Sequence, residues 1–173
     1  MPNRLAALAL AAAVVVPAPI SARQQITPLG RSMVQYRSRD VSAVASYDYS
    51  QRTHDGAWLL IEFAVQARHR IAIHRSELTL VGVDERRYPL ATQMQFLEDH
   101  GTLTRLLQNA AVSRRPLSSY FDTRPAARTI VFFASPGGAV TDSAVSNLDE
   151  VATGDLLFKS ADGKWRQAAI ACC

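Results

Sequence analysis

Two stretches of the chain alternate apolar and polar residues with a period of two, and this alternation constrains the fold more than any other feature. In residues 40–51, "DVSAVASYDYSQ", one set of alternating side chains is Val41, Ala43, Ala45, Tyr47 and Tyr49. The opposite, largely polar set is Ser42, Val44, Ser46, Asp48 and Ser50. In residues 57–68, "AWLLIEFAVQAR", the corresponding set is Leu59, Ile61, Phe63, Val65 and Ala67. Successive side chains of a strand point to opposite faces, so this period is typical of half-buried antiparallel strands. Both stretches are therefore predicted to be strands with one apolar core face.

The second face of residues 57–68 is mixed and allows two interpretations. Trp58, Leu60 and Ala64 either form an exposed binding face or pack against another layer of the protein. Glu62 lies between them. If the face is covered, its carboxylate needs a partner such as an arginine. We expect instead an open face, on which Glu62 keeps the sheet soluble.

The remaining pattern predicts several short strands and one helix. Further strands are predicted in residues 70–74, 77–83 and 128–136 and on both sides of the Asp162-Gly163 turn, whereas the polar stretch 138–154 is predicted to be loop. In the middle of the chain, apolar residues recur at helical spacing, namely Leu103, Leu106, Leu107, Ala110 and Ala111.

An amphipathic helix is therefore predicted near residues 102–114. Asp99 or Thr102 is expected to cap its start, and Pro116 is expected to stop it. Arg114 and Arg115 suit the negative C-terminal end of such a helix. About seven short strands with one helix predict a mainly β, antiparallel, immunoglobulin-like β-sandwich over residues 35–173, with the helix crossing one end.

The N-terminus has the layout of a secretory signal peptide. Arg4 supplies a positive charge, residues 5–16 are an unbroken apolar run, and Ala22 is a small residue suited to cleavage. The apolar run is shorter than the roughly 20 residues that span a bilayer. We expect cleavage after Ala22, a secreted or periplasmic bacterial protein without a membrane span, and a flexible segment over residues 23–34. An uncut N-terminal anchor is the alternative.

The stretch "AWLLIEFAVQARHRIAIHRSELTLVGVDERRYPL", residues 57–90, runs as a long apolar strand, a short strand, a third strand, an acidic turn and an aromatic-proline pair. In this order it resembles the opening of secreted bacterial immunoglobulin-like domains of the telokin-like type. The resemblance covers about a fifth of the chain. It implies an exported binding or scaffolding domain and carries over no catalytic residue.

Motifs of catalysis and cofactor binding are missing from the sequence. It contains no Gly-x-Ser-x-Gly elbow, no P-loop and no dinucleotide-binding fingerprint. The four histidines, at no spacing typical of metal ligands, are His54, His69, His74 and His100. The formal net charge is +4, and the arginines are scattered without interleaved aromatic residues, which is unlike a nucleic-acid interface. We therefore expect no cofactor, no metal and no nucleic-acid partner.

These observations favour a non-catalytic binding or scaffolding module of the cell envelope, whose partner is an unidentified protein or envelope component. One alternative is a small envelope hydrolase that uses His and Asp residues from separate loops. Convergence of at least two histidines on a carboxylate or hydroxyl would favour that alternative. A second alternative is a subunit of a larger envelope assembly, which an unpaired edge strand or an exposed apolar patch would favour.

The only two cysteines, Cys172 and Cys173, are the last two residues. In an oxidising compartment they can form a strained vicinal disulfide or, more easily at a chain end, a disulfide-linked homodimer. A third hypothesis is that residues 166–173 are a frameshift product, since secreted immunoglobulin-like domains often close with an alternating strand that these residues do not supply. A shifted reading frame can be written that would supply it, and the nucleotide sequence decides this hypothesis.

Overall fold

The structure is a computed structural model that describes residues 25–53, 56–82, 85–121, 126–147, 150–161, 163 and 165. The strands of this part are β1 (Gln25–Pro28), β2 (Met33–Arg37), β3 (Val41–Ser46), β4 (Trp58–Ala67), β5 (Ile71–His74), β6 (Thr79–Val81), β7 (Arg87–Pro89), β8 (Ala126–Ile130), β9 (Ser143–Ser146) and β10 (Glu150–Lys159). The helices are α1 (Asp48–Arg52), α2 (Gln93–Glu98) and α3 (His100–Ser113), with 3-10 turns η1 (Arg75–Glu77) and η2 (Leu117–Tyr120). The prediction of a mainly β chain is confirmed.

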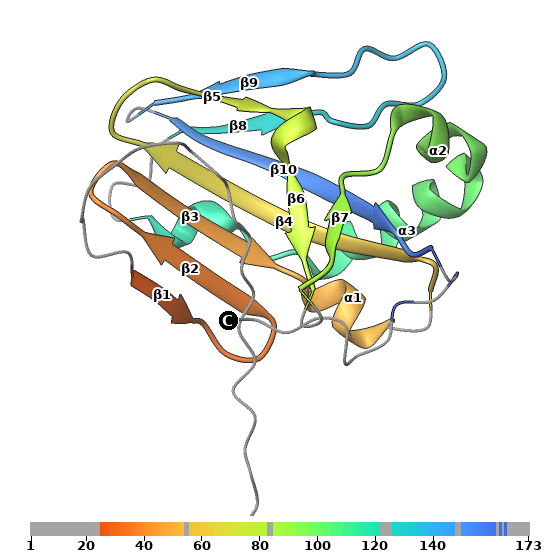
Figure 1. The fold of residues 1–173 in the computed structure, drawn as a ribbon, viewed down its shortest axis with the longest axis horizontal. Helices are drawn as coiled ribbons and strands as arrows, with labels where there is room; N and C mark the ends of the chain where they lie inside the picture. The colour runs from red at the N-terminus through yellow and green to blue at the C-terminus, as the bar shows by residue number, and fades with distance from the viewer. Residues whose placement is uncertain are drawn as a thin grey trace, which may run out of the picture.

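Six strands form the main sheet in the order β1-β2-β3-β4-β10-β8 (Figure 1). The first five are paired antiparallel, as predicted. The outer strand β8 runs parallel to β10, so the expectation of a wholly antiparallel sheet is wrong at this edge. Two small antiparallel pairs, β5 with β9 and β6 with β7, complete the described strands.

The long strand β4 lies inside the main sheet and is buried on both faces. Every residue of β4 is buried except Phe63 and Gln66, which are half-buried. The predicted core face, carrying Leu59 and Ile61, packs in one cluster with Ile73 of β5 and Leu80 of β6. In Figure 1, β6 and β7 lie across this face of the sheet. The alternation in the sequence therefore identified the core face correctly.

The opposite face of β4 is covered by the chain's own helices and 3-10 turn. Trp58 and Leu60 pack with Phe96 of α2 and Leu103 of α3. Ala64 joins a neighbouring cluster. The other buried members of that cluster are Met33, Val44, Leu117, Phe121 and Val151.

The expectation of an exposed binding face is therefore corrected. Trp58 is only 6% exposed, and Leu60 and Ala64 are 0% exposed. These side chains are the interior contacts of a helical layer, which was the other interpretation of the mixed face. The open-face interpretation of Glu62 is likewise wrong, because Glu62 is 9% exposed.

Helix α3 confirms the predicted helix, with a start at His100 rather than near Thr102. Asp99 occupies its N-cap position but makes no side-chain capping bond there, because its carboxylate accepts a hydrogen bond from the Trp58 indole instead. The additional helix α2 begins with a capping box between Thr92 and Gln95. None of the helices in the described ranges has the length and hydropathy needed to cross a membrane.

Two segments expected to lack structure contain strands. The expected flexible segment 23–34 contains β1 and the start of β2, which pair with each other. The expected loop 138–154 contains β9 and the first half of β10. These strands are short or polar, so they carry little apolar alternation. Residues 1–24 and 166–173 lie outside the described residues, and with them the predicted signal peptide, Cys172 and Cys173.

Gly154 on β10 marks a place where three strands approach closely. It pairs with Phe63 on β4 and with Ile130 on β8. A Cβ atom at this position would lie 2.8 Å from the Phe63 ring and 2.9 Å from the Ile130 carbonyl oxygen. Neither distance is tolerated by a real Cβ atom, and the carbonyl belongs to the backbone, so glycine is required here.

We expect Gly154→Ala to lower the free energy of unfolding by about 1–3 kcal/mol, because the added methyl group forces β8 and Phe63 to shift. Urea denaturation measures this change. The control is Gly101→Ala in helix α3, where a Cβ atom meets nothing within 4 Å. This control is expected to raise stability by up to about 1 kcal/mol. Equal effects of the two substitutions would contradict the close approach at Gly154.

Candidate functional site

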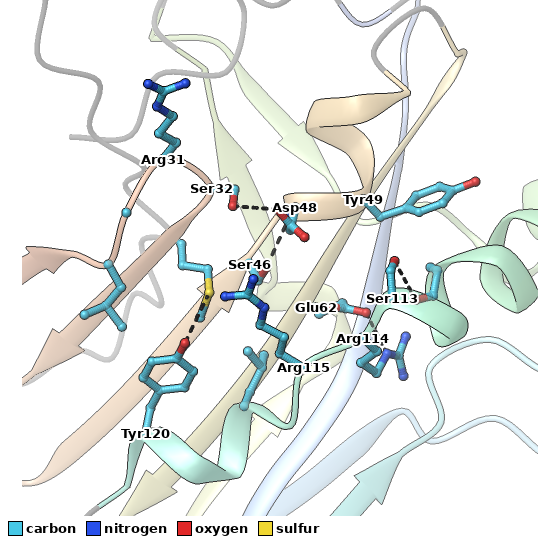
Figure 2. Close-up of a pocket in the computed structure, with 15 residues that line it drawn as sticks. Arg31, Ser32, Ser46, Asp48, Tyr49, Glu62, Ser113, Arg114, Arg115 and Tyr120 are labelled. Carbon is cyan, nitrogen blue, oxygen red and sulfur yellow. Dashed lines mark hydrogen bonds and ion pairs between the residues drawn. The ribbon is translucent and has the colours of Figure 1, made fainter.

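A cavity of about 210 Å³ lies beside the C-terminal end of α3, against the main sheet (Figure 2). Its walls come from the β1–β2 connection, the end of β3, the start of α1, the middle of β4, and the segment from α3 into η2. The polar side chains that the chemistry of the cavity depends on are Ser32, Ser46, Asp48, Glu62, Arg114, Arg115 and Tyr120. The cavity therefore brings together residues that are far apart in the sequence.

Strand register places the first part of this polar lining. Ser46, the last residue of β3, lies opposite Glu62 on β4. On the other side of β4, Glu62 lies opposite Asp155 of β10. Asp48 begins α1 two residues after Ser46, and its backbone N–H donates to the Ser46 hydroxyl. Adjacent strands thus fix Ser46, Glu62 and Asp155 in one row across the sheet.

Glu62 and Asp155 share one arginine. Arg114 Nε donates to Glu62 Oε1 at 2.6 Å, and Arg114 Nη2 donates to Asp155 Oδ1 at 2.7 Å. The Glu62 side chain is buried, whereas that of Arg114 is 39% exposed. A partner arginine is what a covered Glu62 requires, and Arg114 supplies it.

Burial is the largest influence on the pKa of Glu62. It raises the pKa of Glu62 above its ordinary value of 4.5, although the adjacent Arg114 guanidinium acts in the opposite direction. Burial also acts to lower the pKa of Arg114, but its ion pairs with Asp155 and Glu62 outweigh burial and raise that pKa. Arg114 therefore stays charged, and Glu62 ionises less readily than a free carboxylate.

Asp48 has a different environment on the other side of the cavity. Its Oδ1 accepts a hydrogen bond of 3.0 Å from the Ser32 hydroxyl, and its Oδ2 pairs with Arg52 one helical turn away. Burial acts to raise the pKa of Asp48, but hydrogen bonds from Arg52 and Ser32 and the nearby charges of Arg52 and Arg115 outweigh it and lower that pKa. Asp48 is therefore ionised at neutral pH and already has its own cation.

Arg115 differs from its neighbour Arg114 in having no direct partner among the described residues. Among the described residues its guanidinium makes no hydrogen bond or ion pair, and it acts on Asp48 only through space. Arg114 has extended backbone angles (φ −65°, ψ 132°), and Pro116 favours extended backbone at Arg115. Successive side chains of extended backbone point to opposite sides. Figure 2 shows Arg114 turned toward Glu62 and Arg115 extending toward Ser46.

Tyr120 completes the polar lining from η2. Its hydroxyl donates to Met33 Sδ at 3.7 Å, and its backbone carbonyl accepts a bond of 3.2 Å from Gln35 Nε2. The Gln35 bond ties η2 to β2. A thioether sulfur is a weak acceptor, so the Tyr120 hydroxyl remains available to a stronger one.

The histidines do not come together in the described part of the chain. His100 Nε2 lies 3.2 Å from the Ser135 hydroxyl and 3.3 Å from that of Thr104, outside the cavity. His69 and His74 are exposed elsewhere, and His54 lies outside the described residues. No three His, Cys, Asp or Glu side chains within the described ranges are grouped closely enough to hold a metal ion.

Glu62 and Arg114 can each be singled out in the sequence, but the cavity that they share cannot. The two arginines before Pro116 were interpreted only as a helix end, and Asp48 only as the polar face of a strand. Scans of protein-family models, curated proteins and solved structures find no match to this chain.

Arg114→Met removes the cation beside a buried carboxylate. We expect the free energy of unfolding at neutral pH to fall by about 1–3 kcal/mol, the cost of an unpaired buried polar group. The matched control is Arg115→Met, which removes a guanidinium that forms no ion pair with a described residue, and it should change stability by less than about 0.5 kcal/mol. Urea denaturation compares the two variants, and a larger loss in Arg115→Met would contradict the pairing.

Glu62 should also give stability a specific pH dependence. Its folded-state pKa is raised, so the folded protein holds this proton more tightly than the unfolded chain does. The contribution of Glu62 to stability therefore falls as pH rises from its ordinary value through the raised folded-state value. Over that interval, wild type should lose stability relative to Glu62→Gln, which does not titrate. Denaturation of both proteins in steps from about pH 4 to about pH 8 measures the difference, and a constant difference would refute the raised pKa.

Proposed function

We propose that the protein is a non-catalytic binding module of the bacterial cell envelope, exported by the signal peptide over residues 1–22, and that the cavity beside α3 is its binding site. The observation that carries the proposal is the state of the charged groups lining the cavity. Both carboxylates, Asp48 and Glu62, are held by arginines, while Arg115 faces the cavity without a hydrogen-bonded partner among the described residues. This arrangement suits recognition of a ligand better than proton transfer to one.

General acid–base catalysis requires a carboxylate that is free to exchange its proton with a substrate. Glu62 accepts a short hydrogen bond from a guanidinium that also holds Asp155. Asp48 accepts from Arg52 and Ser32 and has a lowered pKa, which keeps it ionised. Both groups are thus committed to internal pairs that give the cavity a fixed shape, and a fixed shape favours binding.

The proposal includes the fold type. An immunoglobulin-like sandwich requires a second β layer against the main sheet, and β5 and β6 contribute Ile73 and Leu80 to a core shared with β4. The parallel strand β8 and the helical layer on the other face are then additions to that arrangement. The helical layer creates the cavity, because α3 and η2 supply part of its wall.

One observation favours the hydrolase alternative. The His100 ring nitrogen contacts the Ser135 hydroxyl at 3.2 Å, as a general base contacts a nucleophile. No carboxylate among the described residues is bonded to His100, whose other described neighbours are Thr104 and the ring of Phe96. Slow hydrolysis of p-nitrophenyl acetate that disappears in Ser135→Ala would favour this alternative over a binding module.

The assembly-subunit alternative has support at the edges of the sheet. Strands β1 and β8 each have one neighbour among the described strands. Ile26 on β1 is 47% exposed, and Val131 just after β8 is 42% exposed. An edge strand of this kind can pair with another chain. Sedimentation of the exported protein as a larger complex would favour this alternative.

We expect a library of small polar fragments, screened by protein NMR, to contain ligands that shift the amide signals of residues lining the cavity. Ser113→Trp, which places an indole at the cavity wall, should abolish those shifts. The matched control is Val112→Trp, because Val112 is 90% exposed on the same helix and does not line the cavity. Fragments that bind equally well to wild type and Ser113→Trp would contradict the assignment of the site.

A further inference from the structure

Charge around the cavity is unevenly matched. Among the described residues, three arginines line it, namely Arg31, Arg114 and Arg115, against the two carboxylates of Asp48 and Glu62. Glu62 is paired with Arg114, and Asp48 is paired with Arg52, which is not part of the lining. Arg31 and Arg115 have no side-chain partner among the described residues. The cavity therefore has positive charge in excess of what its own carboxylates neutralise.

Of the two arginines without a described partner, Arg115 is the one whose guanidinium points into the cavity. In Figure 2 its guanidinium extends toward Ser46 and Asp48, whereas Arg31 points away from them. An arginine presents a planar fork of donors that matches carboxylate and phosphate oxygens. Because this fork has no partner among the described residues, it is available to a ligand.

Two hydroxyl groups supplement the guanidinium. The Ser46 hydroxyl accepts from the Asp48 backbone N–H, and its own proton has no acceptor among the described residues. Among the described residues, the Tyr120 hydroxyl donates only to the weak acceptor Met33 Sδ. An anionic oxygen is a far stronger acceptor than a thioether, so the Tyr120 hydroxyl would donate its hydrogen bond to the anion in place of Met33 Sδ.

Cavity size limits the ligand. Sites that enclose drug-sized molecules measure roughly 300–1,000 Å³, and this cavity measures about 210 Å³. A group of a few heavy atoms fits, such as a phosphate or a short carboxylate. A nucleotide or a sugar chain would have to extend beyond the cavity into solvent.

We infer that the cavity is a binding site for a small oxyanion, a phosphate or carboxylate group, held by Arg115 with the hydroxyls of Ser46 and Tyr120. This inference rests on the proposed function, since it names the ligand class of the same site. Arg114 has a different role and holds Glu62 and Asp155. Two consecutive arginines thus have different roles: Arg114 holds the cavity wall in place, and Arg115 contacts the ligand.

Isothermal titration of the exported protein with inorganic phosphate, acetate, succinate and glycerol 3-phosphate tests the inference. Sodium chloride at matched ionic strength is the blank. At least one oxyanion should bind with one-to-one stoichiometry, and Arg115→Gln should weaken its binding about tenfold or more, as expected for loss of charge-assisted hydrogen bonds. The control is Arg87→Gln, which removes the same charge from an exposed position on β7 that does not line the cavity. Its effect should be less than about twofold.

The source of the oxyanion follows from the ranking of these ligands. Tighter binding of glycerol 3-phosphate than of inorganic phosphate indicates a headgroup, and the reverse indicates the free ion. If Arg115→Gln fails to fold, as judged by circular dichroism, Arg115→Lys takes its place. This variant keeps the charge but loses the fork, so it should bind more weakly than wild type. Equal affinity in wild type and either folded variant would overturn the role of Arg115.

The inference and the proposed function fail in different ways. Suppose that neutral fragments bind in the cavity of wild type but not of Ser113→Trp, and that none of the oxyanions binds. The proposed ligand class is then wrong, and the proposed binding module stands. If neither fragments nor oxyanions bind, both are wrong. Oxyanion affinity that falls equally in Arg115→Gln and Arg87→Gln indicates only general charge attraction and also overturns the site.

Discussion

Burial of β4 on both faces is the constraint on which the rest of the structure depends. Burying one large apolar side chain contributes about 1.5–3 kcal/mol, and β4 carries such side chains on both of its faces. Neither face can be left to water, so one is covered by β5 and β6 and the other by α2, α3 and η2. The helical layer would leave Glu62 as an unpaired buried charge if it did not also deliver Arg114. Packing and ion pairing are therefore satisfied by the same segment of chain.

The core face of β4 could be predicted from the sequence because period-two alternation depends only on local strand geometry. The helix near residues 102–114 could be predicted for the same reason, from its own local period. The environment of the opposite face of β4 could not be predicted from the sequence. Trp58 and Leu60 beside Glu62 fit a covered or an open surface equally well, and the choice depends on a helix that begins at His100. Strands β1 (QITP) and β9 (SAVS) were not predicted because they are short and rich in polar residues, so they show little apolar alternation.

The candidate site was predictable only in fragments. A covered Glu62 was expected to need an arginine, and Arg114 and Arg115 were noted at the end of a helix, but nothing in the sequence joins these observations. The link is made by Pro116 and the extended backbone before it, which send the two adjacent side chains in different directions. Asp48 joins them only because α1 begins immediately after β3 has ended against β4. The cavity is thus a product of tertiary packing.

The close approach at Gly154 has a consequence for recognising distant relatives of this chain. The Phe63 ring lies over Gly154, and the next pair in the same register is Glu62 with Asp155, bridged by Arg114. The pair Glu62-Phe63 on β4 therefore lies opposite the pair Gly154-Asp155 on β10. Arg114, just after helix α3, bridges the two carboxylates. Changing any one of these residues alone leaves a steric clash, a gap or an unpaired charge. The five positions are therefore expected to vary together in any relative that keeps this strand register.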